Sequence, residues 1–258
     1  MAQATTTRAP ASVTREPATG TATGPPRKKA LWPIEFYRSA LGKKYVMAVT
    51  GIIGLGFILV HMLGNLKMYV GPADFNHYSE FLRQILVPIF PHTWFLWIMR
   101  LVLIGAVVLH VHAAYSLTVI NHKARTVDYQ SKRDYIAANY ASRTMRWSGV
   151  IVGLYIIWHL FDLSWTGTGY HYHRGDAYGN VAQSLHRPWV AAIYIVANLL
   201  LGLHLFHGVW SLFQSLGWNN PRFNMWRRRF AQGFAAVIVA GNVSFPIFIL
   251  AGVVSVPK

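Results

Sequence analysis

Four histidines, His61, His110, His159 and His204, lie inside stretches of sequence that are otherwise almost free of charge. An ionisable side chain is costly in such surroundings, so its presence there marks a candidate functional residue. A neutral imidazole is also a common metal ligand in proteins. The four positions therefore predict metal or redox chemistry inside an apolar helical bundle.

The same four histidines fall into two layers of depth. His61 lies five residues and His159 six residues before the end of its apolar stretch, which places both roughly 8–9 Å from that boundary at 1.5 Å per residue. His110 and His204 each lie ten residues before the end of their stretches, or about 15 Å from the opposite boundary. An outer pair and an inner pair are the arrangement that two bis-histidine haems stacked across a bundle require.

Two further histidines keep the inner pair ambiguous. His207 follows His204 by three residues, so the two share one helix face and either is a candidate ligand. His112 follows His110 by two residues and points to nearly the opposite face, so one of those two should reach the interior. The competing interpretation is that these histidines only hydrogen-bond one helix to another.

The elements that must position these histidines are five apolar stretches of membrane-spanning length, which takes roughly 20 residues. Of the 258 residues, 53% are hydrophobic and 12% are charged, which excludes an ordinary soluble domain and a disordered chain. The absence of Cys excludes disulfides, an iron–sulfur cluster ligated by this chain alone, covalent c-type haem and a thiol nucleophile. We predict an all-α integral membrane bundle with five transmembrane helices near residues 45–66, 93–120, 147–165, 188–214 and 231–254.

The sequence before the first span predicts two further segments. Residues 1–30 are rich in Ala, Thr and Pro and end in basic residues, which predicts a disordered basic tail in the cytoplasm. Residues 31–44 mix aromatic and basic side chains, which predicts a short helix at the membrane interface. Residues 45–258 then form the five-helix transmembrane domain, which we expect to be cytochrome b-like.

The distribution of basic residues predicts the orientation. Of the 24 Lys and Arg residues, eight lie in residues 1–44, six in 121–146 and four in 215–230, which leaves six elsewhere. Because cytoplasmic loops carry the excess of Lys and Arg, this places the N-terminus in the cytoplasm. The same basic surface suits an acidic partner.

With these residues in place, the sequence resembles the cytochrome b membrane-anchor subunit of succinate dehydrogenase and fumarate reductase, in its single-anchor, five-span class. The resemblance covers about residues 39–215. It is carried by SALGKKYVMAVTG, HMLGNL from His61, DFNHYSEFL from Asp74, HVHAAYSLTVINHKAR from His110, HLFD from His159 and HLFHGVWSLFQSLG from His204.

The resemblance implies two b haems, the outer one held by His61 and His159 and the inner one by His110 with His207 or His204. It implies two partners on the cytoplasmic face, a flavoprotein with covalent FAD and an iron–sulfur protein, and a place in the bacterial cytoplasmic membrane. Succinate oxidation, a step of the tricarboxylic acid cycle, would occur in the flavoprotein of this respiratory complex II, since this chain has no flavin site. Electrons would then pass through iron–sulfur clusters to a quinone, with menaquinone the expected acceptor.

Candidate quinone-binding residues lie on both sides of the membrane. Asp162 is the only acidic residue inside a span, and it either pairs with a nearby Arg or accepts a hydrogen bond from His159, or it exchanges protons with an outer quinone. Glu80 has the same two interpretations. The inner candidates are Trp32, Tyr37, Ser39 and Lys43.

Three alternatives stay open at this point. Two of the inner histidines could hold a Rieske-like [2Fe–2S] cluster, whose two thiolates must then come from a partner. A histidine-lined membrane transporter is a second alternative, although the sequence has no internal repeat of the kind that transporters show. A pure scaffold that holds the dehydrogenase at the membrane is the third.

Overall fold

The structure is a computed structural model, and it describes residues 31–124, 140–165, 167–218 and 220–257. This part of the chain consists of helices and loops without any strand, which confirms the all-α prediction. In chain order the helices are α1 (Trp32–Arg38), α2 (Ala40–Asn65), η1 (Leu66–Tyr69), α3 (Pro72–Gln84), α4 (Trp94–Lys123), α5 (Tyr140–Leu160), the π-helical turn η2 (Phe161–Trp165), α6 (Ala177–Leu185), α7 (Pro188–Ser215), η3 (Pro221–Phe223) and α8 (Asn224–Leu250).

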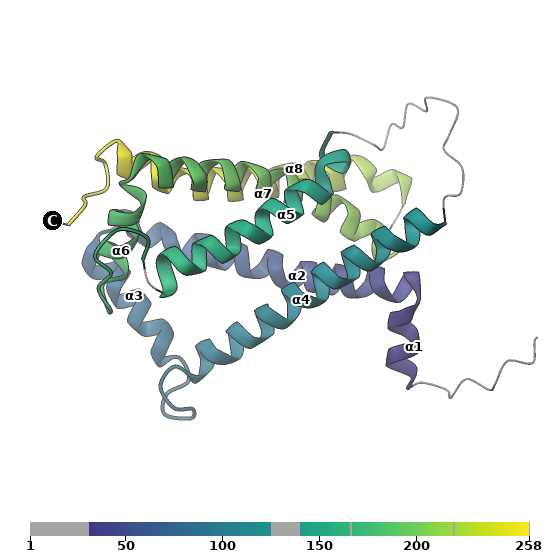
Figure 1. The fold of residues 1–258 in the computed structure, drawn as a ribbon, viewed down its shortest axis with the longest axis horizontal. Helices are drawn as coiled ribbons and strands as arrows, with labels where there is room; N and C mark the ends of the chain where they lie inside the picture. Colours follow the sequence, from purple (N-terminus) through teal and green to yellow (C-terminus); the bar gives the residue numbers. More distant parts are fainter. Residues whose placement is uncertain (1–30, 125–139, 166, 219, 258) are drawn as a thin grey trace, which may run out of the picture.

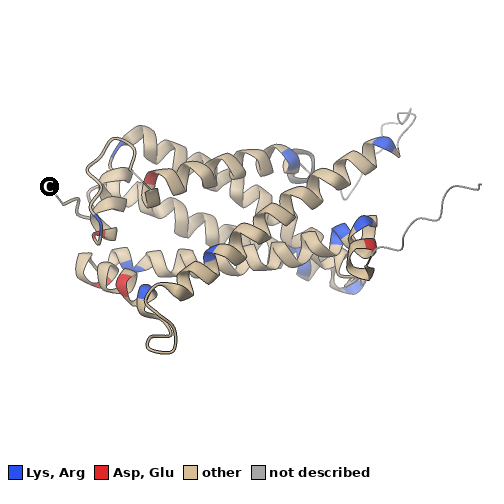
Figure 2. Ribbon diagram, turned by 60° about the horizontal axis from the view of Figure 1, so that its bottom comes forward, with Lys and Arg blue, Asp and Glu red and all other residues tan. Residues whose placement is uncertain are grey.

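Five helical segments are long and apolar enough to cross a membrane, so the predicted membrane bundle is confirmed. Charged side chains lie mainly toward the two ends of the bundle and leave the middle of the long helices nearly free of charge (Figure 2). The five segments are Ala40–Tyr69, Trp94–Lys123, Thr144–Trp165, Pro188–Ser215 and Pro221–Leu250.

The fifth segment begins earlier than predicted. Helix α8 starts at Asn224, whereas the apolar stretch suggested a start at residue 231. Arg227 in its first turn is only 2% exposed, and its guanidinium donates to the carbonyl oxygen of Trp218 and the side-chain oxygen of Asn224. An apolar stretch marks the hydrocarbon region rather than the ends of the helix, which here extends through basic residues beyond it.

The predicted interfacial segment 31–44 contains a sharp corner. Helix α1 ends at Arg38, and residues from Ala40 onward belong to α2. Ser39 makes the corner, because its backbone is extended and its side chain accepts a hydrogen bond of 2.9 Å from the backbone N–H of Gly42. Lys43 Nζ donates to the last two carbonyl oxygens of α1, at 3.1 and 2.8 Å. Helix α1 consequently runs across the axis of α2 (Figure 1).

The long helices lie along one axis, with α3 and α6 at one end and α1 at the other (Figure 1). The main packing pairs are α7 with α8, α2 with α4, and α5 with α7. Within the described part of the chain, α4 and α5 scarcely touch. The bundle therefore consists of an α2/α4 pair and an α5/α7/α8 layer, and α2 also contacts α7 and α8.

The tightest packing surrounds α7. One apolar cluster joins α2, α7 and α8 through Met62, Leu201 and Ile238. A second cluster joins the ends of α6, α7 and α8 and includes Tyr178 and Tyr194. Helix α7 is therefore the helix against which side chains of α2, α6 and α8 pack.

Candidate functional site: two histidine pairs

The outer histidines face each other from α2 and α5. The ring centroids of His61 and His159 are 5.9 Å apart, with the ring planes at 87°. Phe57 stacks on His61 at 5.2 Å, and Tyr155 lies 5.8 Å from His159. The helices thus bring together the two histidines that share the outer depth.

The inner histidines face each other from α4 and α7. The ring centroids of His110 and His204 are 6.4 Å apart, with the ring planes at 57°. His207 makes no ring contact and no hydrogen bond within the described residues. Of the two candidates on α7, it is therefore His204 that lies opposite His110.

Hydroxyl groups fix the proton positions on both inner rings. His110 Nδ1 lies 3.1 Å from Thr50 Oγ1, and that hydroxyl already donates to the carbonyl oxygen four residues before it, at 2.7 Å. His204 Nδ1 lies 3.4 Å from Ser148 Oγ, which donates to the carbonyl oxygen three residues before it, at 3.0 Å. A hydroxyl has one proton, so each oxygen must accept from the imidazole. Both rings therefore carry their proton on Nδ1, and Nε2 keeps a free lone pair.

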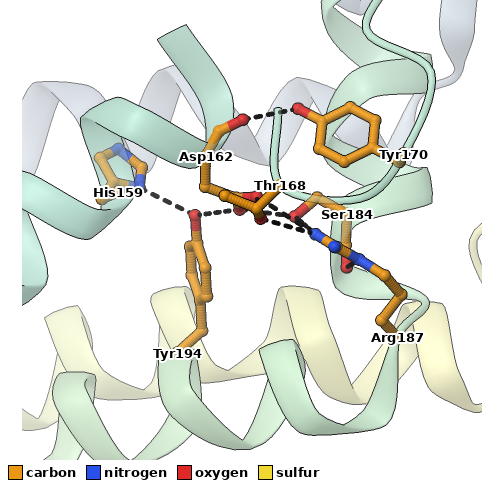
Figure 3. Close-up of polar contacts among 7 residues, drawn as sticks. All are labelled: His159, Asp162, Thr168, Tyr170, Ser184, Arg187 and Tyr194. Carbon is orange, nitrogen blue, oxygen red and sulfur yellow. Dashed lines mark hydrogen bonds and ion pairs between the residues drawn. The ribbon is translucent and has the colours of Figure 1, made fainter. Parts of the chain in front are cut away.

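In the outer pair, His159 also has a hydroxyl at its Nδ1, but this hydroxyl belongs to a tyrosine. His159 Nδ1 lies 3.3 Å from the hydroxyl of Tyr194, and that hydroxyl donates to Asp162 Oδ2 at 3.0 Å (Figure 3). The Tyr194 oxygen is then free only to accept from His159. Three of the four histidines thus present an unprotonated Nε2, which is the nitrogen form that binds a metal.

Asp162 is fully buried at the start of the π-helical turn η2, where it accepts four side-chain hydrogen bonds (Figure 3). Its carboxylate forms an ion pair of 3.1 Å with Arg187, so one of the two structural roles considered for Asp162 is present. The other structural role, accepting a hydrogen bond from His159, is not present directly, because Tyr194 lies between His159 and Asp162 and bonds to both. The four donors are Thr168, Ser184, Arg187 and Tyr194.

Tyr170, in the loop after this turn, closes the cluster from above. Its hydroxyl donates to the backbone carbonyl oxygen of Asp162 at 2.8 Å. Burial, with a smaller effect of the Asp162 carboxylate, raises the pKa of the Tyr170 hydroxyl above its ordinary value. Tyr170 therefore remains a proton donor at neutral pH.

Glycines give the inner rings room. Gly51 lies beside the His110 ring, and Gly149 beside the His204 ring, with 3.8 and 3.3 Å between a ring carbon and the position that a Cβ would take. At Gly54, one turn after Gly51, no heavy atom of the described residues lies within 4 Å of that position, and Gly153 on α5 is the same. Gly51 and Gly149 thus leave the space beside the two inner rings free of a side chain, and Gly54 and Gly153 have open space at the position of a Cβ.

The inner quinone candidates lie at the corner between α1 and α2. The Tyr37 hydroxyl is 2.5 Å from His112 Nδ1, and the two rings stack with centroids 5.8 Å apart. Lys43 is buried and also lies over the Tyr37 ring. The Ser39 hydroxyl donates to the carbonyl oxygen of Phe36, while Trp32 is 75% exposed.

The two outer quinone candidates belong to separate networks. Glu80 in α3 accepts from His92 and Gln84 and pairs with Arg83, and none of these residues contacts Asp162. The hydrogen bond from His92 is the main reason why the pKa of the Glu80 carboxyl lies below its ordinary value. The structure therefore does not unite Glu80 and Asp162 in one site.

Within the described residues, no group of three or more His, Asp or Glu side chains could hold a metal ion. The available ligand sets are pairs of facing imidazoles. The sequence identified these four imidazoles by depth, but it gave no sign of Thr50, Ser148 or Tyr194 as their partners, because a hydroxyl in an apolar helix has no periodic signature.

Comparison with known proteins gives one family match. Residues 121–243 match the family described as the succinate dehydrogenase/fumarate reductase transmembrane subunit. This region contains His159 and His204, one histidine from each pair. No curated protein and no solved structure matches the chain.

Proposed function

Because residues 121–243 match the family of succinate dehydrogenase/fumarate reductase transmembrane subunits, we propose that the chain is such a subunit and carries electrons through two b haems to a quinone. In this proposal it is a membrane subunit of a succinate or fumarate oxidoreductase, so the enzyme activity belongs to the whole complex. In this proposal a flavoprotein with FAD and an iron–sulfur subunit are its partners, and menaquinone is the substrate at this chain.

The observation that carries the proposal is the proton position on the histidines. Hydrogen bonds at Nδ1 leave Nε2 of His110, His159 and His204 free. Each of these bonds joins two helices through Nδ1 and leaves Nε2 available, which is what a haem ligand requires. His61 completes the outer pair by facing His159.

Each facing pair also supplies two imidazoles at close range. The ring centroids are 5.9 Å apart in the outer pair and 6.4 Å apart in the inner pair. His61 with His159, and His110 with His204, would each hold one haem, which would supply a one-electron carrier at each pair.

The geometry supports His204 over His207 as the inner ligand on α7. His204 faces His110 and has its Nδ1 proton held by Ser148, which is 1% exposed. A ligand whose second nitrogen is fixed in this way keeps its orientation, and His207 has no such partner among the described residues.

The alternative of a Rieske-like [2Fe–2S] cluster on the inner pair is less well supported. It needs two thiolates from a partner, because the chain has no Cys. His110 is ten residues from the inner end of its predicted span, or about 15 Å deep. A partner docked at the membrane surface would have to reach that depth, whereas a haem requires nothing from a partner.

The proposed orientation places α1 and the connection between α7 and α8 in the cytoplasm. Arg222, Arg227, Arg228 and Arg229 lie at that connection, and Lys43 and Lys44 beside α1. Four of the five acidic residues of the described part, Asp74, Glu80, Asp162 and Asp176, lie instead in α3, η2 or next to α6, and those elements are at the opposite end. By the positive-inside rule the basic end faces the cytoplasm of a bacterial inner membrane, where the two partners would dock.

The proposed quinone site is at this inner end. A groove of about 500 Å³ between α1, α2 and α4 is lined mainly by apolar side chains, and its two hydroxyl groups belong to Tyr45 and to Thr50, which bonds to His110. A quinone tail would lie in this groove, with its polar ring toward Tyr37, whose hydroxyl contacts His112. Lys43 is buried and its ammonium group is bonded to the carbonyl oxygens of Tyr37 and Arg38, so it is not free to meet a quinone. Asp162, which is fully buried with both oxygens bonded, is poorly suited to meet a quinone. The groove is lined by Phe36, Tyr45, Val46, Val49, Thr50, Ile53, Leu101, Val102, Gly105, Ala106 and Leu109.

Single histidine substitutions in the purified complex test the proposal. His61→Ala and His110→Ala are each expected to remove one b haem and to abolish quinone reduction, while succinate oxidation with an artificial dye persists. His77→Ala, at an exposed histidine of α3, is the matched control and should retain both haems. Quinone reduction that survives both substitutions would instead identify the chain as a scaffold.

A further inference from the structure

We infer that Tyr194 is a positioning residue for the outer site, which holds His159 by accepting its Nδ1 proton and connects it to the buried Asp162 carboxylate. This inference rests on the proposed function, because it assigns His159 as a ligand. It adds a residue that touches neither a metal nor a substrate, but decides the orientation and electron density of a ligand.

His159, Tyr194 and Asp162 are linked by two hydrogen bonds, and the direction of each bond follows from the Asp162 carboxylate. A carboxylate accepts and does not donate, so the 3.0 Å contact with Oδ2 must use the Tyr194 proton. The 3.3 Å contact with His159 must then use the imidazole proton. No other assignment satisfies both contacts while Asp162 pairs with Arg187 at 3.1 Å.

Asp162 is itself held in place. Ser184 donates to Oδ2 at 2.5 Å, and Arg187 and Thr168 donate to Oδ1. These donors come from α6 and from the loops on either side of it, so the carboxylate cannot turn away from Tyr194 without breaking several bonds (Figure 3). The Asp162 carboxylate is therefore held in the position where it accepts the Tyr194 proton.

Tyr194 is equally restricted. It is 5% exposed and packs in the apolar cluster at the end of α6, α7 and α8. Its ring lies 5.3 Å from Tyr155 at 89° and 5.8 Å from His159 at 64°. Both the ring and the hydroxyl are fixed, so Tyr194 can hold one orientation of His159.

The outer arrangement differs from the inner one in its last acceptor. The hydroxyls of Thr50 and Ser148 donate to backbone carbonyl oxygens, whereas that of Tyr194 donates to a carboxylate. Hydrogen bonds to an ionised acceptor are roughly twice as strong as neutral ones. The Tyr194 oxygen is thus the better acceptor, and it should make His159 the more basic ligand.

Tyr194→Phe, studied in the whole complex, tests the inference. We expect the midpoint potential of the outer haem to rise, because a less basic ligand stabilises oxidised iron less, and the inner haem to be unchanged. Loss of this outer-shell bond should also weaken retention of the outer haem about 10–100-fold, measured by transfer to an apo-haemoprotein. Tyr155→Phe is the matched control, because its ring also lies against His159 but its hydroxyl bonds to Asn198.

Ser184→Ala gives a second test, in which the midpoint potential of the outer haem should shift in the opposite direction. It removes the other donor to Oδ2, so the bond from Tyr194 strengthens and the outer potential should fall. This variant decides the matter if Tyr194→Phe does not assemble. Equal outer potentials in the wild type and both variants would overturn the inference, whereas a wild-type complex without haem would overturn the proposed function instead.

Discussion

Thr50 in α2 and His110 in α4 are joined by a hydrogen bond of 3.1 Å between two helices that pack against each other. Thr50 is 7% exposed and also donates to its own helix at 2.7 Å. One hydroxyl therefore determines which nitrogen of His110 carries the proton, and it does so from the helix that bears His61, the proposed outer ligand.

Removal of this hydroxyl should affect the inner site alone. Thr50→Val keeps the shape of the side chain but leaves the Nδ1 proton of His110 unpaired, so retention of the inner haem should fall about 10–100-fold. Haem transfer to an apo-haemoprotein, followed optically, measures this. Thr118→Val is the control, because Thr118 on α4 makes the same kind of bond to its own helix, at 2.9 Å, and has no hydrogen bond to a histidine among the described residues. Equal haem loss in both variants would contradict the role given to Thr50.

The two histidines of α7 should behave differently. His204→Ala is expected to remove the inner haem, because His204 faces His110 with ring centroids 6.4 Å apart. His207→Ala should retain it. Haem content per complex and the reduced-minus-oxidised spectrum distinguish the two variants, and the reverse result would assign His207 as the ligand.

Asp162 should also matter for stability. Asp162→Ala leaves the Arg187 charge without its 3.1 Å partner in a largely buried position, which should lower the free energy of unfolding by about 3–5 kcal/mol. Denaturation of the detergent-solubilised complex measures the change. Glu80→Gln, at an exposed ion pair, is the control and should leave the unfolding midpoint near that of the wild type. Similar midpoints for the two variants would show that the Asp162 cluster is not structural.

The groove between α2 and α4 gives a prediction for the quinone. Gly105 lines this groove, and no described heavy atom lies within 4 Å of the position of a Cβ there. Gly105→Phe should fill the groove and raise the KM for quinone severalfold, without changing succinate oxidation with a dye. Val108→Phe, at a 60% exposed position of the same helix, is the control. An unchanged KM in Gly105→Phe would place the quinone elsewhere.

The sequence was sufficient for the spans and for grouping the four histidines into two facing pairs, because both predictions follow from apolar length and a rise of 1.5 Å per residue. It could not identify Thr50, Ser148 or Tyr194, because their bonds depend on how each helix is rotated against its neighbour. The choice between His204 and His207, about 60° apart on one helix, needed the same information. The corner at Ser39 was missed for a different reason, since the aromatic and basic pattern of residues 31–44 continues across it.

The central claim is that the four histidines form two haem sites, and a spectrum of the purified complex tests it most directly. We predict a b-type α-band in the dithionite-reduced minus oxidised spectrum, with two haems per chain by chemical quantification on the same sample. Iron without a haem band would contradict the claim, and would direct attention to a histidine-ligated cluster on His110 and His204.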